Sequence, residues 1–229
     1  MSEHPPKPAR PESILLTEDS DYWIGHTPEG DFSIGRKGEK DAFKNLDHIS
    51  SNADFYRKMR VLLYIQKRAE RQKDGSLVRE EVDGEVLNMQ NDISDEAPES
   101  SRFIFDHNCY TAVAYVMNPE ETSLKDLEFA DAGEDSFEWE KLSHDDLAKK
   151  ALEVGLPAFG AVIGEKVYRE LGTDSARDHN FIIFDQDPAG DLICFEKTEL
   201  GGPIRLTTLR KIHERYSRYS DRLWSVQKI

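Results

Sequence analysis

The chain has very little cysteine, with only Cys109 and Cys194 among its 229 residues. A zinc site built from several thiolates is therefore excluded, and one disulfide is the most that could form. Reducing conditions would leave both thiols free. We expect no cofactor and no metal, and the chemistry of each thiol has to be judged from its neighbours in the sequence.

The chain also lacks a long apolar segment. No run approaches the roughly 20 apolar residues that a membrane-spanning helix needs. Residues 1–6 contain no apolar stretch typical of a signal peptide. We therefore expect a cytoplasmic protein that does not enter a membrane, with export by a non-classical route as the alternative.

An excess of positive charge is missing as well. Lys and Arg number 30 against 45 Asp and Glu, which gives a formal net charge of −15. Binding to nucleic acid or to anionic membranes requires clustered positive charge. The composition argues against both and leaves a basic protein as a partner that the acidic surface could bind.

The first half of the chain divides into a tail and an extension. Residues 1–13 carry four prolines among charges and are predicted to be a disordered tail. Residues 14–101 form an N-terminal extension or subdomain of unknown role. Within it we predict a hairpin from residues 22–24 and 32–35, and an amphipathic helix over residues 54–71. The acidic composition of residues 79–101 indicates a solvated linker or an exposed insertion.

Residues 102–229 form the second predicted domain. Ser143, followed three residues later by Asp146, predicts a helix over residues 144–154. A second helix is predicted over 161–171, and a basic helix over 209–219. Between them, two β-rich runs at 179–185 and 191–197 flank turn residues and predict an antiparallel hairpin. Helices and antiparallel strands together indicate an α+β fold.

Residues 103–117 carry the main chemical signal of the chain. A polar turn leads to Asn108, a good N-cap, so Cys109 becomes the first residue of a short apolar helix. A thiol at a helix N-terminus lies near unpaired N–H donors and the positive end of the helix dipole, which favour the nucleophilic thiolate. The alternative is a buried core helix in which Cys109 only packs.

A nucleophilic cysteine needs a base, and the base needs a group that orients it. His179 opens the first strand of the predicted hairpin. A turn centred between Asp187 and Pro188 would place Glu196 directly opposite His179, on the same face of the sheet. A register slip of one residue would turn Glu196 to the other face and put Lys197 in its place.

These three residues, in this order, resemble the papain-like cysteine hydrolases, and among them the NlpC/P60-type amidases. The matching segments are residues 108–112, 178–183 and 195–197. The resemblance implies a papain-like core in which a buried helix bearing Cys109 packs on an antiparallel sheet. It also implies Cys109 as nucleophile, His179 as general base and then general acid, and Glu196 as orienting group. The family more often has Asn, Gln, His or Asp at the third position.

The resemblance further implies cleavage of an amide bond, with a peptidoglycan-like cell-wall peptide as the first substrate. A protease, deamidase or isopeptidase acting on proteins is the alternative enzyme. A non-catalytic, acidic interaction protein with a structural Cys109 is the other alternative. His107 is a competing base or oxyanion donor beside Cys109.

Two further features leave alternatives open. Cys194 shares the strand face of Glu196, so it could be a second thiol of the site, a disulfide partner of Cys109 or a core residue, and core packing is favoured. Residues 185–196 follow part of an EF-hand loop, with acids at positions 1 and 3, glycine at 6 and glutamate at 12. The flanking residues favour strands, whereas an EF-hand requires helices.

Overall fold

The computed structural model describes residues 11, 13–26, 31–46, 53–73, 109–117, 137–171, 178–198, 202–219 and 221–229. The chain divides into two units, Met1–Ser100 and Ser101–Ile229. Most of the predicted tail and the acidic residues 79–101 lie outside the described residues. Ser13, which we placed in the tail, is instead the first residue of a strand.

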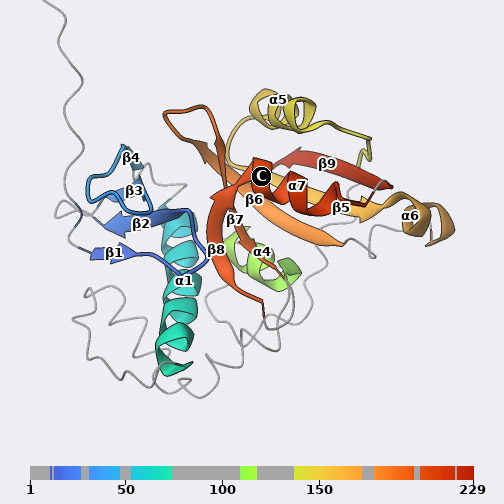
Figure 1. Cartoon of the computed structure of the whole chain (residues 1–229). Helices are drawn as coiled ribbons and strands as arrows, with labels where there is room; N and C mark the ends of the chain where they lie inside the picture. Colours follow the sequence, from blue (N-terminus) through green and yellow to red (C-terminus); the bar gives the residue numbers. More distant parts are fainter. Residues whose placement is uncertain are drawn as a thin grey trace, which may run out of the picture. The chain divides into compact units, whose positions relative to one another are not determined.

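A four-stranded antiparallel sheet and one helix make up the described part of the first unit (Figure 1). The strands lie in chain order, β1(Ser13–Leu15), β2(Tyr22–His26), β3(Phe32–Arg36) and β4(Lys44–Leu46). The predicted hairpin is confirmed, because β2 pairs with β3 from Tyr22 opposite Arg36 to His26 opposite Phe32.

The amphipathic helix of the first unit is α1(Ala53–Lys73), so the helix predicted over 54–71 is confirmed. Its fully buried side chains are Met59, Leu62 and Leu63. On the sheet, Trp23 is buried and its Nε1–H donates to the backbone oxygen of Glu39 at 3.0 Å. The apolar residues of α1 and of the sheet that the sequence pattern marks are therefore buried in the structure.

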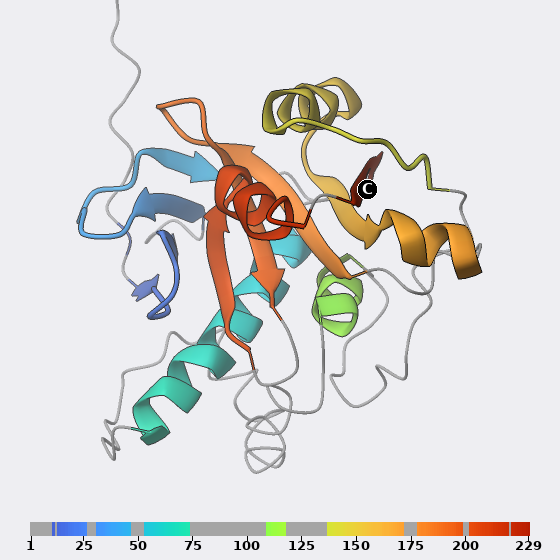
Figure 2. The same ribbon diagram turned by 45° about the vertical axis from the view of Figure 1, so that its right-hand side comes forward.

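The second unit is built on a five-stranded antiparallel sheet (Figures 1 and 2). Its strand order is β8-β7-β6-β5-β9. The strands are β5(Ala158–Gly164), β6(His179–Gln186), β7(Leu192–Lys197), β8(Ile204–Thr208) and β9(Arg222–Lys228). The described helices are α4(Cys109–Met117), α5(His144–Val154), α6(Glu165–Leu171) and α7(Leu209–Tyr216).

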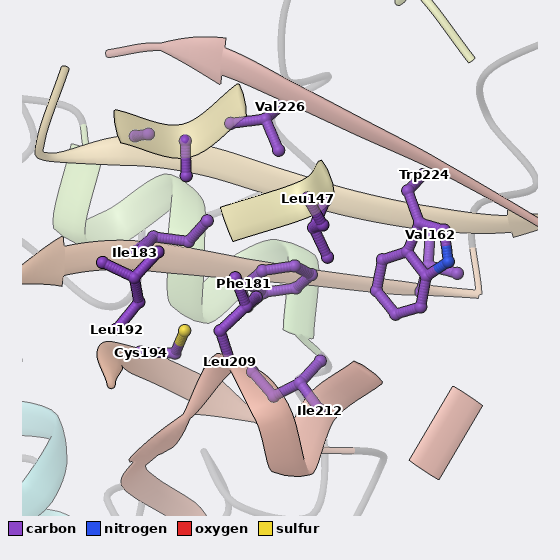
Figure 3. Packing of buried hydrophobic residues seen from close by; sticks show 12 residues of the cluster. Leu147, Val162, Phe181, Ile183, Leu192, Cys194, Leu209, Ile212, Trp224 and Val226 are labelled. Carbon is purple, nitrogen blue, oxygen red and sulfur yellow. The ribbon is translucent and has the colours of Figure 1, made fainter. Parts of the chain in front are cut away.

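Two helices cover one face of this sheet, and α4 packs on the other. The core of the first face combines residues of α5 and α7 with side chains from β5, β6, β7 and β9, among them Phe181, Cys194 and Trp224 (Figure 3). Helix α4 contacts β6 and β7 and contributes no residue to this cluster. In Figure 3, α4 is the pale green helix behind β6.

Helix α5 has the bounds that its sequence predicts. The side chain of Ser143 accepts a hydrogen bond from the backbone N–H of Asp146, which satisfies one free donor of the first turn. Gly155 ends the helix with a φ of 91°, a conformation that favours glycine. The predicted α5 is confirmed because its start and stop signals are both local.

The helix predicted over 161–171 is wrong in its first part. Residues up to Gly164 belong to β5, and only Glu165–Leu171 is helical. All seven residues of β5 are buried, and the strand lies between β6 and β9. A short apolar run of this kind looks the same whether it is a buried strand or a buried helix. Gly160 is required here, because a Cβ would lie 2.3 Å from the ring of Phe181.

The end of the chain also differs in detail. The basic helix begins at Leu209 as predicted but ends at Tyr216, three residues early, and Ser217 caps it. The strand β9 that follows was not predicted. The α+β class is confirmed, with two antiparallel sheets. Among the described helices, none combines the length and the apolar character that crossing a bilayer requires.

Candidate active site

Cys109 is the first residue of α4, as the sequence predicts. The helix is apolar and its buried side chains include Ala112, Val113 and Val116, which fix it against β6 and β7. Cys109 itself is only 4% exposed. Its expected N-cap, Asn108, lies outside the described residues, as does the competing base His107.

His179 begins β6 and is fully buried. Its ring lies nearly parallel to the rings of Phe181 and Tyr216, with centroid separations of 5.9 and 5.0 Å. Phe181 comes from the same strand and Tyr216 from α7. The two aromatic rings restrict the rotation of the imidazole and hold its plane fixed.

Glu196 is the direct partner of His179. The Nε2–H of His179 donates to Oε2 of Glu196 at 2.7 Å, and both side chains are fully buried. The other nitrogen of the imidazole, Nδ1, has no hydrogen-bond partner among the described residues. Glu196 therefore fixes the tautomer and leaves Nδ1 available to the thiol of Cys109.

Two arginines compensate the buried charge of Glu196. Arg205, on the neighbouring strand β8, contacts Oε1 with Nε at 2.8 Å and Nη2 at 2.7 Å. Arg215 of α7 reaches Oε1 and Oε2 at 3.1 and 3.2 Å. A buried carboxylate is strongly unfavourable unless it is paired and hydrogen-bonded. These donors pair both oxygens of Glu196 in place of solvent.

The register that brings His179 to Glu196 differs from the predicted one. Ile182 pairs with Phe195 and Ile183 with Cys194, so Glu196 continues the register opposite Phe181, two residues from His179. A shift by two residues keeps the strand face, whereas a shift by one would reverse it. The two side chains therefore still meet, as diagonal neighbours within reach of a long side chain.

The hairpin turn explains the register change. Strand pairing ends at Gln186 opposite Leu192, and the ladder shifts between Ile183 and Asp185, as at a β-bulge. Oδ1 of Asp187 accepts the backbone N–H groups of Ala189 and Asp191, at 2.8 and 3.0 Å. The turn is therefore centred later than the dipeptide from which we predicted it.

The thiol of Cys109 interacts with the side chain of His179. Burial by itself raises the pKa of this thiol. The neighbouring imidazole of His179 and its charge, with the backbone N–H groups of Asn180 and Tyr110, more than offset burial and bring the pKa below its ordinary value of 9.0. The combined effect favours the thiolate.

The imidazole of His179 is shifted in the opposite direction. Burial alone would lower its pKa, but the interactions with Cys109 and Glu196 raise it from 6.5 to about 9. A lowered pKa of the thiol and a raised pKa of the imidazole both favour the thiolate–imidazolium form of the pair over the neutral form. This pair can attack a carbonyl carbon and can then protonate a leaving group.

Several residues of the site were missed from the sequence. Arg205 lies directly opposite Glu196 in the β7–β8 pairing, and a hairpin through Gly201 and Gly202 could have revealed it. Arg215 and Tyr216 reach the site from α7, which only the tertiary packing brings close. Asn180 follows His179 in the sequence, and no sequence pattern marks it as a functional residue.

Cys194 lies in the apolar core of the second unit. It is fully buried in the apolar cluster of β5, β6, α5 and α7, and both cysteines are free thiols. Burial, with the charge of Glu196, raises its pKa well above 9.0. Core packing, the favoured reading of Cys194, is confirmed, and a Cys109–Cys194 disulfide is absent from the structure.

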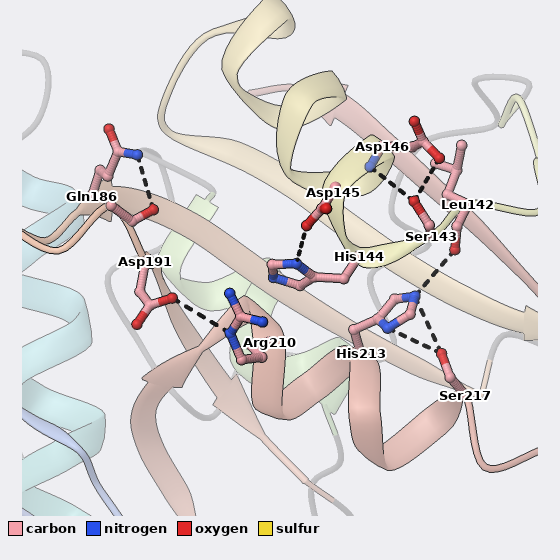
Figure 4. A network of polar contacts seen from close by, with 11 residues as sticks. Leu142, Ser143, His144, Asp145, Asp146, Gln186, Asp191, Arg210, His213 and Ser217 are labelled. Carbon is pink, nitrogen blue, oxygen red and sulfur yellow. Dashed lines mark hydrogen bonds and ion pairs between the residues drawn. The ribbon is translucent and has the colours of Figure 1, made fainter.

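The EF-hand alternative for residues 185–196 is wrong. The segment is the end of β6, a turn and β7, without flanking helices. Its last residue, Glu196, forms ion pairs with His179 and two arginines. Beside this turn, Asp191 pairs with Arg210 at 3.6 Å at the start of α7 (Figure 4). The described residues hold no group of three or more acidic, histidine or cysteine side chains placed to bind a metal ion.

Searches of the chain against protein-family models, curated protein sequences and solved structures find no match. The assignment of a function therefore depends on the geometry of Cys109, His179 and Glu196.

Proposed function

We propose that this protein is a papain-like cysteine hydrolase that cleaves an amide bond by acyl transfer. The observation that carries the proposal is the chain of contacts from Cys109 through His179 to Glu196, with the two pKa values shifted in opposite directions. Helix α4 on the sheet of β6 and β7 would be the papain-like core. The expected family and the observed contacts support the same roles.

In the first half of the reaction, the thiolate of Cys109 attacks the carbonyl carbon and forms a C–S bond, while the carbonyl electron pair moves to oxygen. The imidazolium of His179 then gives its Nδ1 proton to the amide nitrogen. The C–N bond breaks and the amine leaves, so a thioester on Cys109 and a neutral imidazole remain.

In the second half, neutral His179 removes a proton from water, and the resulting hydroxide attacks the thioester. The C–S bond breaks, the acid leaves, and the thiolate–imidazolium pair is restored. Arg205 and Arg215 pair with the carboxylate of Glu196 at each step. The role of Glu196 is to orient the imidazole and to stabilise the imidazolium.

The first substrate class that we propose is a peptide of bacterial cell wall, by analogy with the NlpC/P60-type amidases. The test is to incubate the full chain with purified cell-wall fragments and, separately, with an unfolded protein. Mass spectrometry would then detect new amine and carboxyl ends. Cys109→Ala serves as the inactive control, and Cys194→Ala as the matched active one.

Fragments released by the wild type and by Cys194→Ala, but not by Cys109→Ala, would support the hydrolase. Release from the cell wall alone would identify a wall amidase, and cleavage of the protein alone a protease. If neither substrate is cleaved and Cys109 forms no thioester with an activated ester, the hydrolase proposal is wrong and Cys109 is structural.

A further inference from the structure

Asn180 carries a buried amide that no described residue pairs. The residue is fully buried, and neither Oδ1 nor Nδ2 has a hydrogen-bond partner in the part of the chain that the structure describes. Leaving a buried amide unpaired is costly, and the great majority of buried polar groups in proteins are hydrogen-bonded. An apolar side chain of similar size would suit this position in β6 better for stability alone. The exception therefore calls for a functional reason.

The position of Asn180 relates it to the nucleophile in two ways. Its backbone N–H interacts with the sulfur of Cys109. Its side chain alternates with those of His179 and Phe181, and Phe181 belongs to the cluster under α5 and α7. The side chain of Asn180 therefore points to the opposite face of the sheet. On that face lies α4, which starts at Cys109 (Figure 3).

Acyl transfer at this place creates a need for such a group. When the thiolate attacks, the carbonyl oxygen becomes negative, and donors fixed in advance around it lower the barrier. The backbone N–H of Cys109, at the start of α4, supplies one donor. A second donor has to come from a side chain or backbone group near the sulfur.

We propose that Asn180 is this second donor and completes the oxyanion hole. Its Nδ2–H would bond the oxygen only while that oxygen is negative. No bond to Asn180 forms or breaks: the electron pair moves from the carbonyl bond to oxygen and returns when the leaving group departs. The inference rests on the proposed hydrolase function and adds a catalytic residue to Cys109 and His179.

Two reactions of the same thiol separate this role from a structural one. Alkylation of Cys109 by iodoacetamide displaces iodide and forms no oxyanion, whereas acylation by p-nitrophenyl acetate passes through one. Both rates are measured on the full chain for the wild type, for Asn180→Leu, which keeps the shape, and for Asn180→Asp, which replaces the donor by an acceptor.

We expect acylation to fall about 100-fold in both variants, as for loss of one oxyanion donor elsewhere. Alkylation should stay unchanged in Asn180→Leu, which puts no charge beside the thiol, whereas the carboxylate of Asn180→Asp opposes the thiolate and should slow both reactions. Asn180→Leu should also melt at a higher temperature, because it removes an unpaired buried amide. If the Asn180→Leu protein does not fold, Asn180→Ser takes its place, because it keeps a small polar group. Its acylation and alkylation rates are compared in the same way.

A parallel fall of both rates in Asn180→Leu would show that Asn180 only supports the fold near Cys109, and unchanged acylation in that variant would show that it does not touch the oxyanion. Either result overturns the inference and leaves the hydrolase proposal standing. A wild-type protein whose Cys109 is alkylated but never acylated would contradict the hydrolase itself.

Discussion

The two cysteines occupy two buried regions of the same unit, and their chemistry differs because of their neighbours. Cys109 stands at the start of α4 beside the imidazole of His179, and its pKa is lowered. Cys194 stands within β7 among apolar side chains, near the carboxylate of Glu196, and its pKa is raised. Burial therefore does not decide the state of a thiol, whereas the charge and donors next to it do.

Glu196 affects the two thiols in opposite ways. It raises the pKa of His179, which in turn stabilises the thiolate of Cys109. The same negative charge disfavours a thiolate at Cys194. One carboxylate thus supports the nucleophile through an imidazole and keeps the core thiol protonated.

The largest effect is expected from His179→Asn, which keeps a polar side chain and removes the cation. Burial then raises the pKa of Cys109 with nothing from an imidazole to oppose it. A thiol whose pKa lies at 9 or above is only about 1% ionised at pH 7, so alkylation by iodoacetamide should slow roughly 100-fold. Mass spectrometry of the labelled protein measures the rate at each cysteine.

Cys194 is the internal control for this variant, because its reactivity does not depend on His179. It should stay unlabelled in the native protein before and after the substitution. An unchanged rate at Cys109 in His179→Asn would mean that the helix start, and not the imidazole, activates the thiol.

A smaller effect is expected from Glu196→Gln, which preserves shape but removes the charge. The pKa of His179 should fall, because the charge of Glu196 is one of the interactions that raise it. Alkylation of Cys109 should then slow by less than in His179→Asn. NMR titration of the His179 ring checks the direction.

The same variant should lower stability. Arg205 and Arg215 lose the carboxylate they share. Breaking a buried ion pair costs about 3–5 kcal/mol, and here we expect the low end, because the side chain of Arg215 is 33% exposed and can turn to solvent. Urea unfolding measures this loss. A fully stable Glu196→Gln protein would contradict the account of the arginines.

The smallest effect is expected from Cys194→Ala. Removing one buried sulfur from the apolar cluster leaves a small cavity and should cost about 1 kcal/mol of unfolding free energy. Alkylation and acylation at Cys109 should not change. Loss of acylation in this variant would show that Cys194 takes part in the reaction. The contrast between a reactive Cys109 and a structural Cys194 would then be wrong.

Much of the site could be predicted from the sequence because its signals are local. A polar turn before an apolar run marks the helix start at Cys109, and β-rich runs around a turn mark the hairpin of His179 and Glu196. The face shared by these two residues depends only on whether the register shift is even or odd. The predicted face is therefore right, although the predicted register is wrong by two residues.

The remaining features depend on packing that no local pattern contains. The seven buried residues of β5 read as a helix because burial on both faces removes the alternation that marks a strand. Arg205 and Arg215 lie on β8 and α7 and meet at Glu196 only in the folded sheet. The unpaired amide of Asn180 is visible only once its surroundings are known.

The most direct test is the pH dependence of Cys109 alkylation in the Cys194→Ala background. The lowered pKa of the thiol and the raised pKa of His179, about 9, predict fast alkylation at neutral pH, through the ion pair. This state should be lost only as the pH rises through about 9, where the imidazolium gives up its proton. A rate that follows one ordinary ionisation at pH 9 or above, with slow reaction at pH 7, would contradict the pair.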